Sequence, residues 1–533
     1  MRKLRPELLN CLKHYSSRDF VRDLTAGIIV AIIALPLSIA LALASGVSPE
    51  QGLYTAIVGG FVLSALGGSK VQIAGPTAAF ATIVAGVVAR SGMEGLAAAT
   101  LLAGLFLIVM GLLHLGSLIR FIPYTITTGF TAGIAITIAI GQIKDFLGLQ
   151  FQNSPIGTMD KLQEVISTIG TLSVPALLVG CFSLAILIFW PKLSKKIPAS
   201  LVAVIASALL VKLASLPVNT IGDLYTISNT PPQFHMPVLH LDTIASVIPD
   251  AFTIAILAAI ESLLSAVVAD DMIGSKHNSN MELVAQGAAN AASALFGGIP
   301  ATGAIARTAA NIKNGGRSPV AGMVHAVVLL LFLVLLMPYA ALIPMPCIAA
   351  ILFQVAYNMS GWRAVAKELK KAPKSDIAVL VLTIALTVIY DLVVAIGVGL
   401  VLACLLFMKR MADEFHVREC VAKDYNVVPT PWVKVVEITG PMFFGAADKI
   451  SDVEPENGET ALVLDMKGVP SVDISALNSM EHLLWECQGK GVQLILVHVG
   501  SQPMHALKKS GLEPFILPDM PAALKYLDVK PAQ

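Results

Sequence analysis

The sequence predicts a polytopic α-helical membrane protein that carries one small soluble α/β domain at its C-terminal end. Hydrophobic residues make up 56% of the 533 residues and charged residues only 13%, whereas a soluble protein carries about 25% charge. Up to about Met408 the chain contains repeated apolar runs near the ~20 residues that cross a bilayer. Beyond Lys409 the composition becomes that of an ordinary soluble domain.

Fourteen apolar runs are candidate spans. They cover roughly 24–44, 52–67, 71–90, 95–115, 121–145, 169–190, 198–214, 247–270, 281–297, 301–314, 319–337, 339–357, 375–390 and 391–408. We therefore expect a polar N-terminal segment at 1–23 and a transmembrane domain at 24–408. Lys and Arg are concentrated in the connections after even-numbered spans. This bias predicts that those connections and both termini face the cytoplasm.

The C-terminal part shows short β-rich runs alternating with helical patterns. The runs are Val433–Ile438, Ala461–Met466 and Val492–Val497, with helical patterns at 475–488 and 504–510. This alternation predicts a small α/β domain at 430–533, joined to the last span by a linker at 409–429. No phosphate-binding glycine motif follows any of these strands, which argues against an ATPase or a dinucleotide-binding domain.

Two apolar segments are interrupted by Gly and Pro followed by Thr, at 73–79 and 298–304. In lipid, a broken backbone is tolerated only where it is buried in protein or lines a cavity, and a matching pair of breaks points to a transporter's binding site. Pro76 and Pro300 are expected in the first turns of two helices that begin within the membrane. Two such helix starts would form an anion site from unpaired N–H groups. The alternative is a proline kink in each of two ordinary helices.

Two charged residues lie within predicted spans, where charge is expensive and usually functional. Glu261 follows the apolar run 255–260, and a carboxylate there can carry a proton or help to hold Na⁺. Its alternative role is structural, as a partner of Arg307.

Arg307 follows the second break by about one helical turn and would add positive charge to the anion site, form a salt bridge, or snorkel to the membrane surface. Glu282, Gln286 and Asn290 share one helix face and are expected to form interhelical hydrogen bonds.

Several motifs resemble the SulP (sulfate permease) anion transporters, which are related to the solute-carrier-26 proteins. The matching stretches are 52–56 followed by 68–70, then 280–287 and 302–308, and the resemblance extends over nearly the whole chain. Three further stretches, 129–133, 142–148 and 258–264, most resemble the bacterial C4-dicarboxylic acid transporter.

This resemblance implies an inverted 7+7 repeat, in which a core domain moves against a gate domain, with a cytoplasmic STAS domain at 430–533. It implies that the substrate contacts Leu37, Thr77, Ala78, Ala304, Ala306 and Arg307, and that Glu261, Thr302 and Gly303 serve cation coupling. The stretch 465–476 resembles the STAS strand-to-helix loop. Ser475 stands one position later than the serine that is phosphorylated in related anti-sigma antagonists, so a role in dimerisation or regulatory docking is favoured.

The function expected from these observations is secondary active transport, not enzymatic catalysis. The predicted protein moves small anions together with H⁺ or Na⁺ in an elevator-like cycle. A C4-dicarboxylate such as succinate or fumarate is favoured, with sulfate and bicarbonate as close competitors. The alternatives are an uncoupled anion exchanger or channel on the same scaffold, and a membrane-anchored signalling protein whose STAS domain is the working part.

The expected binding partners follow from this expected transport function. They are the anion, the lipid bilayer, a second copy in a homodimer, and a cytoplasmic regulator that binds the STAS domain, with the bacterial inner (plasma) membrane as the location. Nucleic acid is not expected, because the net charge is only +1. The six cysteines are scattered without a C-x-x-C motif, so neither a metal centre nor a cofactor is expected beyond the co-transported cation.

Overall fold

The computed structural model describes residues 4–117, 123–153, 155, 157–194, 197–237, 241–390, 392–420, 432–446, 448–451, 453–454 and 458–528. The chain divides into two compact units, Met1–Leu400 and Val401–Gln533. The first is helical and the second contains a four-stranded sheet.

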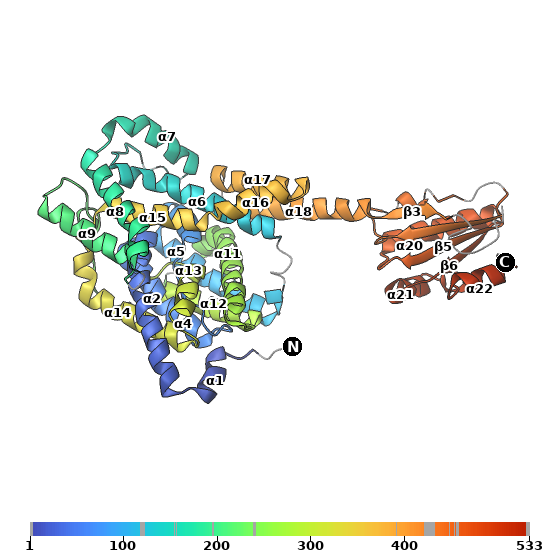
Figure 1. Ribbon diagram of the computed structural model, residues 1–533, viewed down its shortest axis with the longest axis horizontal. Coiled ribbons are helices and arrows are strands. Elements are labelled where there is room, and N and C mark those ends of the chain that lie inside the picture. The colour runs from blue at the N-terminus through green and yellow to red at the C-terminus, as the bar shows by residue number, and fades with distance from the viewer. Residues whose placement is uncertain are drawn as a thin grey trace. The chain divides into compact units, whose positions relative to one another are not determined.

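The helical unit follows the predicted pattern closely (Figure 1). Its helices are α1 (Glu7–Cys11), α2 (Ser17–Ala44), α3 (Pro49–Tyr54), α4 (Gly60–Leu66), α5 (Ala81–Leu112), α6 (Tyr124–Leu147), α7 (Thr158–Thr168), α8 (Val174–Leu193), α9 (Ala199–Leu213), α10 (Ile221–Leu224), α11 (Leu241–Ile273), α12 (Ser279–Leu295), α13 (Ile305–Lys313), α14 (Val320–Ala340), α15 (Met345–Met359), α16 (Trp362–Lys371), α17 (Lys374–Ile389) and α18 (Leu392–Asp413). Each of the fourteen predicted runs overlaps at least one of these helices, although the run at 52–67 covers parts of α3 and α4 and the run at 71–90 begins before α5. Seven of the described helices are long and apolar enough to cross a membrane.

Local sequence signals explain several helix boundaries. Ser16 caps α2 by accepting a hydrogen bond from the Asp19 backbone N–H, and the Asp19 side chain in turn accepts from the Ser16 N–H. Within α5, Gly92 has a φ of 67° and breaks the helix between two predicted spans. Gly148, with a φ of 65°, ends α6 in the left-handed conformation that glycine adopts without strain.

The helices of this unit form two packed groups. One group contains α2, α4, α5 and α11 to α14, and the other contains α6, α8, α9, α15 and α17. Figure 1 shows α5, α11, α12 and α13 side by side in the middle of the helical unit. Small residues allow this close packing, because a Cβ at Gly104 of α5 would lie 2.6 Å from the carbonyl oxygen of Gly287 on α12.

The second unit contains a sheet with the strand order β3-β4-β5-β6. Its strands are β3 (His416–Glu419), β4 (Val433–Thr439), β5 (Ala461–Gly468) and β6 (Gln493–Val497), and only β3 runs antiparallel to its neighbour. Helices α20 (Ile474–Gly489) and α21 (Ser501–Lys509) contribute to the core on one face, whereas α22 (Met520–Tyr526) packs with the side chains of the other face. The short helix α19 (Asp448–Ser451) follows β4.

The predicted α/β organisation of the tail is confirmed, but its start differs from the prediction. Helix α18 continues to Asp413, and β3 lies within the predicted linker at 409–429. The sheet therefore begins at His416 rather than near 430. The residues of β3 are almost all exposed. The strand therefore lacks the alternation of apolar and polar residues by which a strand is recognised in sequence.

Candidate anion site

The two interrupted segments lie directly against each other. Strand β1 (Ala74–Gly75) pairs antiparallel with β2 (Thr302–Gly303). The backbone N–H of Ala304 also donates to the carbonyl oxygen of Ile73 at 2.8 Å. The breaks thus satisfy part of each other's backbone hydrogen bonding, as a break inside a membrane domain must.

The prolines do not occupy the positions predicted for them. The helix that follows the first break begins with a 3₁₀ turn at Ala78 and continues as α5. The helix that follows the second break is α13, which begins at Ile305. We call these two the half-helices. Pro76 and Pro300 lie upstream in the extended parts of the breaks, so the prediction that they fill the first helical turns is wrong. Proline has no N–H to donate, and Pro76 stands immediately after the last paired residue of β1.

Both half-helices begin without a capping side chain. Thr77 and Ala304 occupy the capping positions, and neither side chain bonds to the following backbone N–H groups. The first N–H groups of a helix have no partner within the helix and carry its positive dipole end. Two uncapped starts at one place therefore form an environment that favours an anion.

A cavity of about 450 Å³ opens between the two groups of helices at this point. The predicted site residues among those lining it are Leu37, Thr77, Ala78, Glu261, Gly303, Ala304, Ala306 and Arg307. The opposite wall includes Thr131 of α6 and Asn358 of α15. Thr302 is the one predicted site residue outside the lining. It is fully buried, and its Oγ1 lies 2.9 Å from the hydroxyl oxygen of Ser262.

Glu261 is linked to the first break by a side-chain hydrogen bond. The hydroxyl of Thr77 donates to its carboxylate at 2.8 Å. Among the described residues, no ion pair joins Glu261 to Arg307, although both line the cavity. The carboxylate is therefore oriented by a neutral hydroxyl, and its charge is not neutralised by a direct cationic partner.

Arg307 is almost completely buried, with 1% of its surface exposed, so it does not snorkel to the membrane surface. Its Nη2 donates to the hydroxyl of Ser38 at 3.3 Å and to the carbonyl oxygen of Pro76 at 3.2 Å. Its Nε and Nη1 are buried without a hydrogen-bond partner in the described part of the chain. Glycine at position 75 leaves the space that the guanidinium fills, because a Cβ there would overlap it.

The polar face of α12 bonds to the second break and to the loop that precedes the first. The carboxylate of Glu282 accepts from two successive backbone N–H groups, beginning with that of Gly68 at 2.7 Å. Asn290 accepts from the N–H of Ala301 at 2.9 Å, while the side-chain NH₂ groups of Gln286 and Asn290 donate to the Ala301 carbonyl oxygen. The shared face predicted hydrogen bonds between elements, and the structure identifies the partners as backbone groups of the second break and of the loop before the first.

Sequence reasoning missed several polar residues of the site. Ser262 donates to Gln286 and accepts from the Gly303 N–H, and Ser38 accepts from Arg307. Both serines directly follow a predicted site residue, Glu261 in one case and Leu37 in the other, and this adjacency was the available signal. Thr131 and Asn358 had no such signal.

Comparison with known proteins agrees with this architecture. The sulfate permease family model matches residues 20–383, and the STAS domain model matches residues 424–525. The putative sulfate transporter YvdB of Bacillus subtilis is 42% identical over 511 residues, covering 94% of this chain and 95% of its own. The bicarbonate transporter BicA of Picosynechococcus is 33% identical, covering 94% of this chain and 93% of its own.

Two solved structures share the fold. The murine anion transporter Slc26a9 in the inward-facing state aligns with a TM-score of 0.88 at 18% identity, covering 98% of this chain and 94% of its own. The transmembrane domain of a cyanobacterial BicA aligns with a TM-score of 0.64 at 31% identity, covering 73% of this chain and 98% of its own. Because the family model matches more than half of the chain, and relatives above 30% identity cover nearly all of it, the chain belongs to the sulfate permease (SulP/SLC26) family of anion transporters and carries a C-terminal STAS domain.

Proposed function

We propose that this protein is a secondary active transporter that moves a small anion together with H⁺ or Na⁺ through Glu261. The observation that carries the proposal is the hydrogen bond from Thr77 to Glu261. It joins a carboxylate inside the transport domain to one of two uncapped helix starts that line the same cavity.

The arrangement supplies a physical reason for coupling. An anion at the helix starts would be attracted by the N–H groups and by the charge of Arg307, but it would be repelled by an ionised Glu261 on the same cavity. At short range in a poorly solvated site, such repulsion is large. A proton on Glu261, or a Na⁺ beside it, removes the repulsion, so that anion and cation bind together.

The position of the cavity supports an elevator-like cycle. The breaks, α11 and α13 belong to one group of helices, whereas Thr131 and Asn358 belong to the other. Movement of the first group against the second would carry the bound ions past the wall that α6 and α15 provide.

The proposed substrate is a C4-dicarboxylate, with sulfate and bicarbonate as the competing candidates. The cavity has polar groups on both walls, the helix starts on one and Thr131 and Asn358 on the other, and a dicarboxylate would present a carboxylate to each. The names of the relatives, a putative sulfate transporter and a bicarbonate transporter, favour the competitors. We further propose that both termini face the cytoplasm of a bacterial cell, and that the STAS domain serves homodimer formation or regulatory docking.

Uptake by reconstituted protein tests coupling and substrate together. Liposomes containing the full chain are given labelled succinate, sulfate or bicarbonate under a pH gradient alone or a Na⁺ gradient alone. We expect one of the two gradients to drive accumulation, and Glu261→Gln to abolish the gradient's effect. Glu94→Gln, which alters a surface carboxylate whose partner is His235, serves as the control.

The outcomes separate the alternatives. Flux that ignores both gradients and is unchanged in Glu261→Gln would indicate an uncoupled exchanger or channel. If the reconstituted protein moves none of the three anions under any gradient, the result would contradict the proposal and favour the signalling alternative.

A further inference from the structure

A second large cavity, of about 760 Å³, lies at the end of the helical unit where α1 is found. Its lining includes Arg5, Glu7, Lys70, Lys276, Asn278 and Arg317. These residues come from α1 and the segment before it, and from the loops after α4, α11 and α13. None of them lines the candidate anion site.

The charge of this lining is strongly one-sided. Four of its side chains are cationic, and Glu7 is the only carboxylate among the described lining residues. Glu7 lies 3.9 Å from the Lys70 ammonium, and its other oxygen accepts from the Asn10 side chain. An ion pair at that distance with a half-exposed lysine is weak, so Glu7 does not neutralise the pocket.

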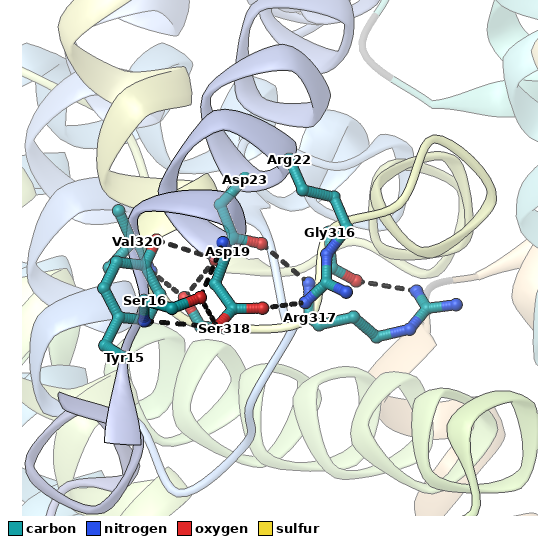
Figure 2. A network of polar contacts seen from close by, with 9 residues as sticks. All are labelled: Tyr15, Ser16, Asp19, Arg22, Asp23, Gly316, Arg317, Ser318 and Val320. Atoms are coloured by element: carbon teal, nitrogen blue, oxygen red, sulfur yellow. Dashed lines mark hydrogen bonds and ion pairs between the residues drawn. The ribbon is translucent and has the colours of Figure 1, made fainter. Parts of the chain in front are cut away.

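Asp23 contacts the loop that carries Arg317, but its carboxylate bonds to other groups than the Arg317 side chain. Asp23 accepts from the hydroxyls of Tyr15 and Ser318 and from the backbone N–H of Arg317. Figure 2 shows the Arg317 side chain leading away from Asp23, with its guanidinium bonded to the Gly316 carbonyl oxygen. Asp23 therefore fixes the loop that carries Arg317 without forming an ion pair with its guanidinium.

Two further carboxylates beside these loops are also engaged. Asp270 accepts from the Ser275 hydroxyl and from the backbone N–H and ring of His277. Glu282 accepts from the N–H groups of Gly68 and Ser69. Asp270 and Glu282 are thus committed to hydrogen bonds within the loops, and the described lining of the cavity itself holds four cationic side chains and one carboxylate, Glu7.

We propose that this cavity binds a phosphate-bearing anion. Guanidinium groups bind phosphate oxygens through paired, charge-assisted hydrogen bonds, and lysines add compact positive charges. The volume lies within the range of about 300–1,000 Å³ typical of ligand pockets, so it accommodates a molecule larger than a single phosphate ion. The phosphate comes either from a soluble phosphate ester or from a phospholipid headgroup.

The position of the cavity gives its ligand a mechanical role. Lys70 lies shortly before β1, and Arg317 lies shortly after α13. A bound phosphate group would tie the segment before α1 to both of these loops, because Arg5, Lys70 and Arg317 each contribute a cation to the same pocket. The ligand would therefore stiffen the supports of both breaks, and this binding proposal stands independently of the transported anion.

Binding of inorganic pyrophosphate to the full chain tests the proposal. The protein is placed in nanodiscs of phosphatidylcholine, and affinity is measured by calorimetry at constant ionic strength. We expect Lys70→Gln/Lys276→Gln to weaken binding at least about tenfold, because each lost charge-assisted bond is worth about that factor or more. The control, Lys370→Gln/Lys371→Gln, removes the same charge from exposed positions on α16 and should change affinity less than about twofold.

A variant with the opposite expected effect guards against misfolding as an explanation. Glu7→Gln removes the one carboxylate among the described lining residues, so it should tighten pyrophosphate binding. Equal affinity in the wild type and in Lys70→Gln/Lys276→Gln, or no pyrophosphate binding to the wild type, would overturn the proposal.

Nanodiscs of equal parts phosphatidylcholine and phosphatidylglycerol distinguish the two sources of phosphate. If phosphatidylglycerol weakens pyrophosphate binding to the wild type but not to Lys70→Gln/Lys276→Gln, the ligand is a lipid headgroup. If it changes neither, while binding still requires the two lysines, the ligand is a soluble phosphate compound.

Discussion

Replacing Gly75 by Ala should expel the guanidinium of Arg307 from its position beneath the first break. A Cβ at residue 75 would overlap Nη1 of Arg307 and would lie 3.2 Å from its Cζ. The far end of a long side chain can usually move aside at little cost. Arg307 has no such freedom, because it is 1% exposed and bonded to Ser38 and Pro76.

The cost can be estimated from those two bonds. A hydrogen bond involving a charged group contributes about 1.5–3 kcal/mol, and overpacking a filled core costs a similar amount. We therefore expect Gly75→Ala to lower the free energy of unfolding by about 3 kcal/mol. If Arg307 adds charge to the anion site, the apparent KM for the transported anion should also rise at least about tenfold.

Thermal unfolding in detergent, combined with uptake in liposomes, measures both effects. Gly86→Ala is the matched control, because a Cβ there would meet only the end of the Arg90 side chain at 3.3 Å. Arg307→Met removes the guanidinium, so Gly75→Ala should cost less than about 1 kcal/mol in that background. An undiminished cost with Met at position 307 would refute the reasoning, since the clash would then lie elsewhere.

Three further predictions each concern a single residue. Thr77→Val removes the donor to Glu261 at nearly constant volume and should reduce uptake driven by the cation gradient, whereas Thr77→Ser should retain it; equal uptake by both variants would show that the hydroxyl has no role. Asp23→Asn replaces an acceptor of three hydrogen bonds and should lower the free energy of unfolding by about 1.5–3 kcal/mol, and an unchanged melting temperature would contradict this. Burial raises the pKa of Cys487 to about 11, so at pH 8 about one thiol in a thousand is ionised and maleimide should modify this residue only after denaturation; labelling at Cys487 in the folded protein, located by peptide mass spectrometry, would argue against its buried position.

Patterns along the chain were sufficient to predict the helices and the meeting of the two breaks. Apolar runs of the right length coincide with the observed helices, since both depend on local hydrophobicity. The breaks at 73–79 and 298–304 were recognisable because Gly, Pro and Thr interrupt such runs, and the two breaks meet as expected, although their pairing as strands β1 and β2 was not predicted. Eight of the nine predicted site residues line one cavity, while their roles in binding and coupling remain predictions.

Long-range partners and exposed strands could not be predicted in this way. Arg307 bonds to Ser38, 269 positions away, and nothing in either local pattern indicates the contact. Pro76 and Pro300 were placed in helical turns because proline suits that position in general, whereas here the backbone pairing of β1 and β2 takes precedence. The exposed strand β3 was assigned to a linker because it pairs with β4 through backbone hydrogen bonds. Such bonds leave no pattern in the side chains by which a strand could be recognised.

The two breaks are alike in sequence but contribute differently to the site. Both charged groups of the cavity, Glu261 and Arg307, come from the second half of the transport domain. Each bonds to the first break, Glu261 to the Thr77 hydroxyl and Arg307 to the Pro76 carbonyl oxygen. The first break therefore holds two opposite charges on one cavity by separate hydrogen bonds, and the described structure contains no direct ion pair between them. A direct pair would neutralise both charges and leave neither available to an ion. The uncharged first break is thus where small changes should disturb anion and cation binding together, whereas changes at Glu261 or Arg307 should affect mainly one of them.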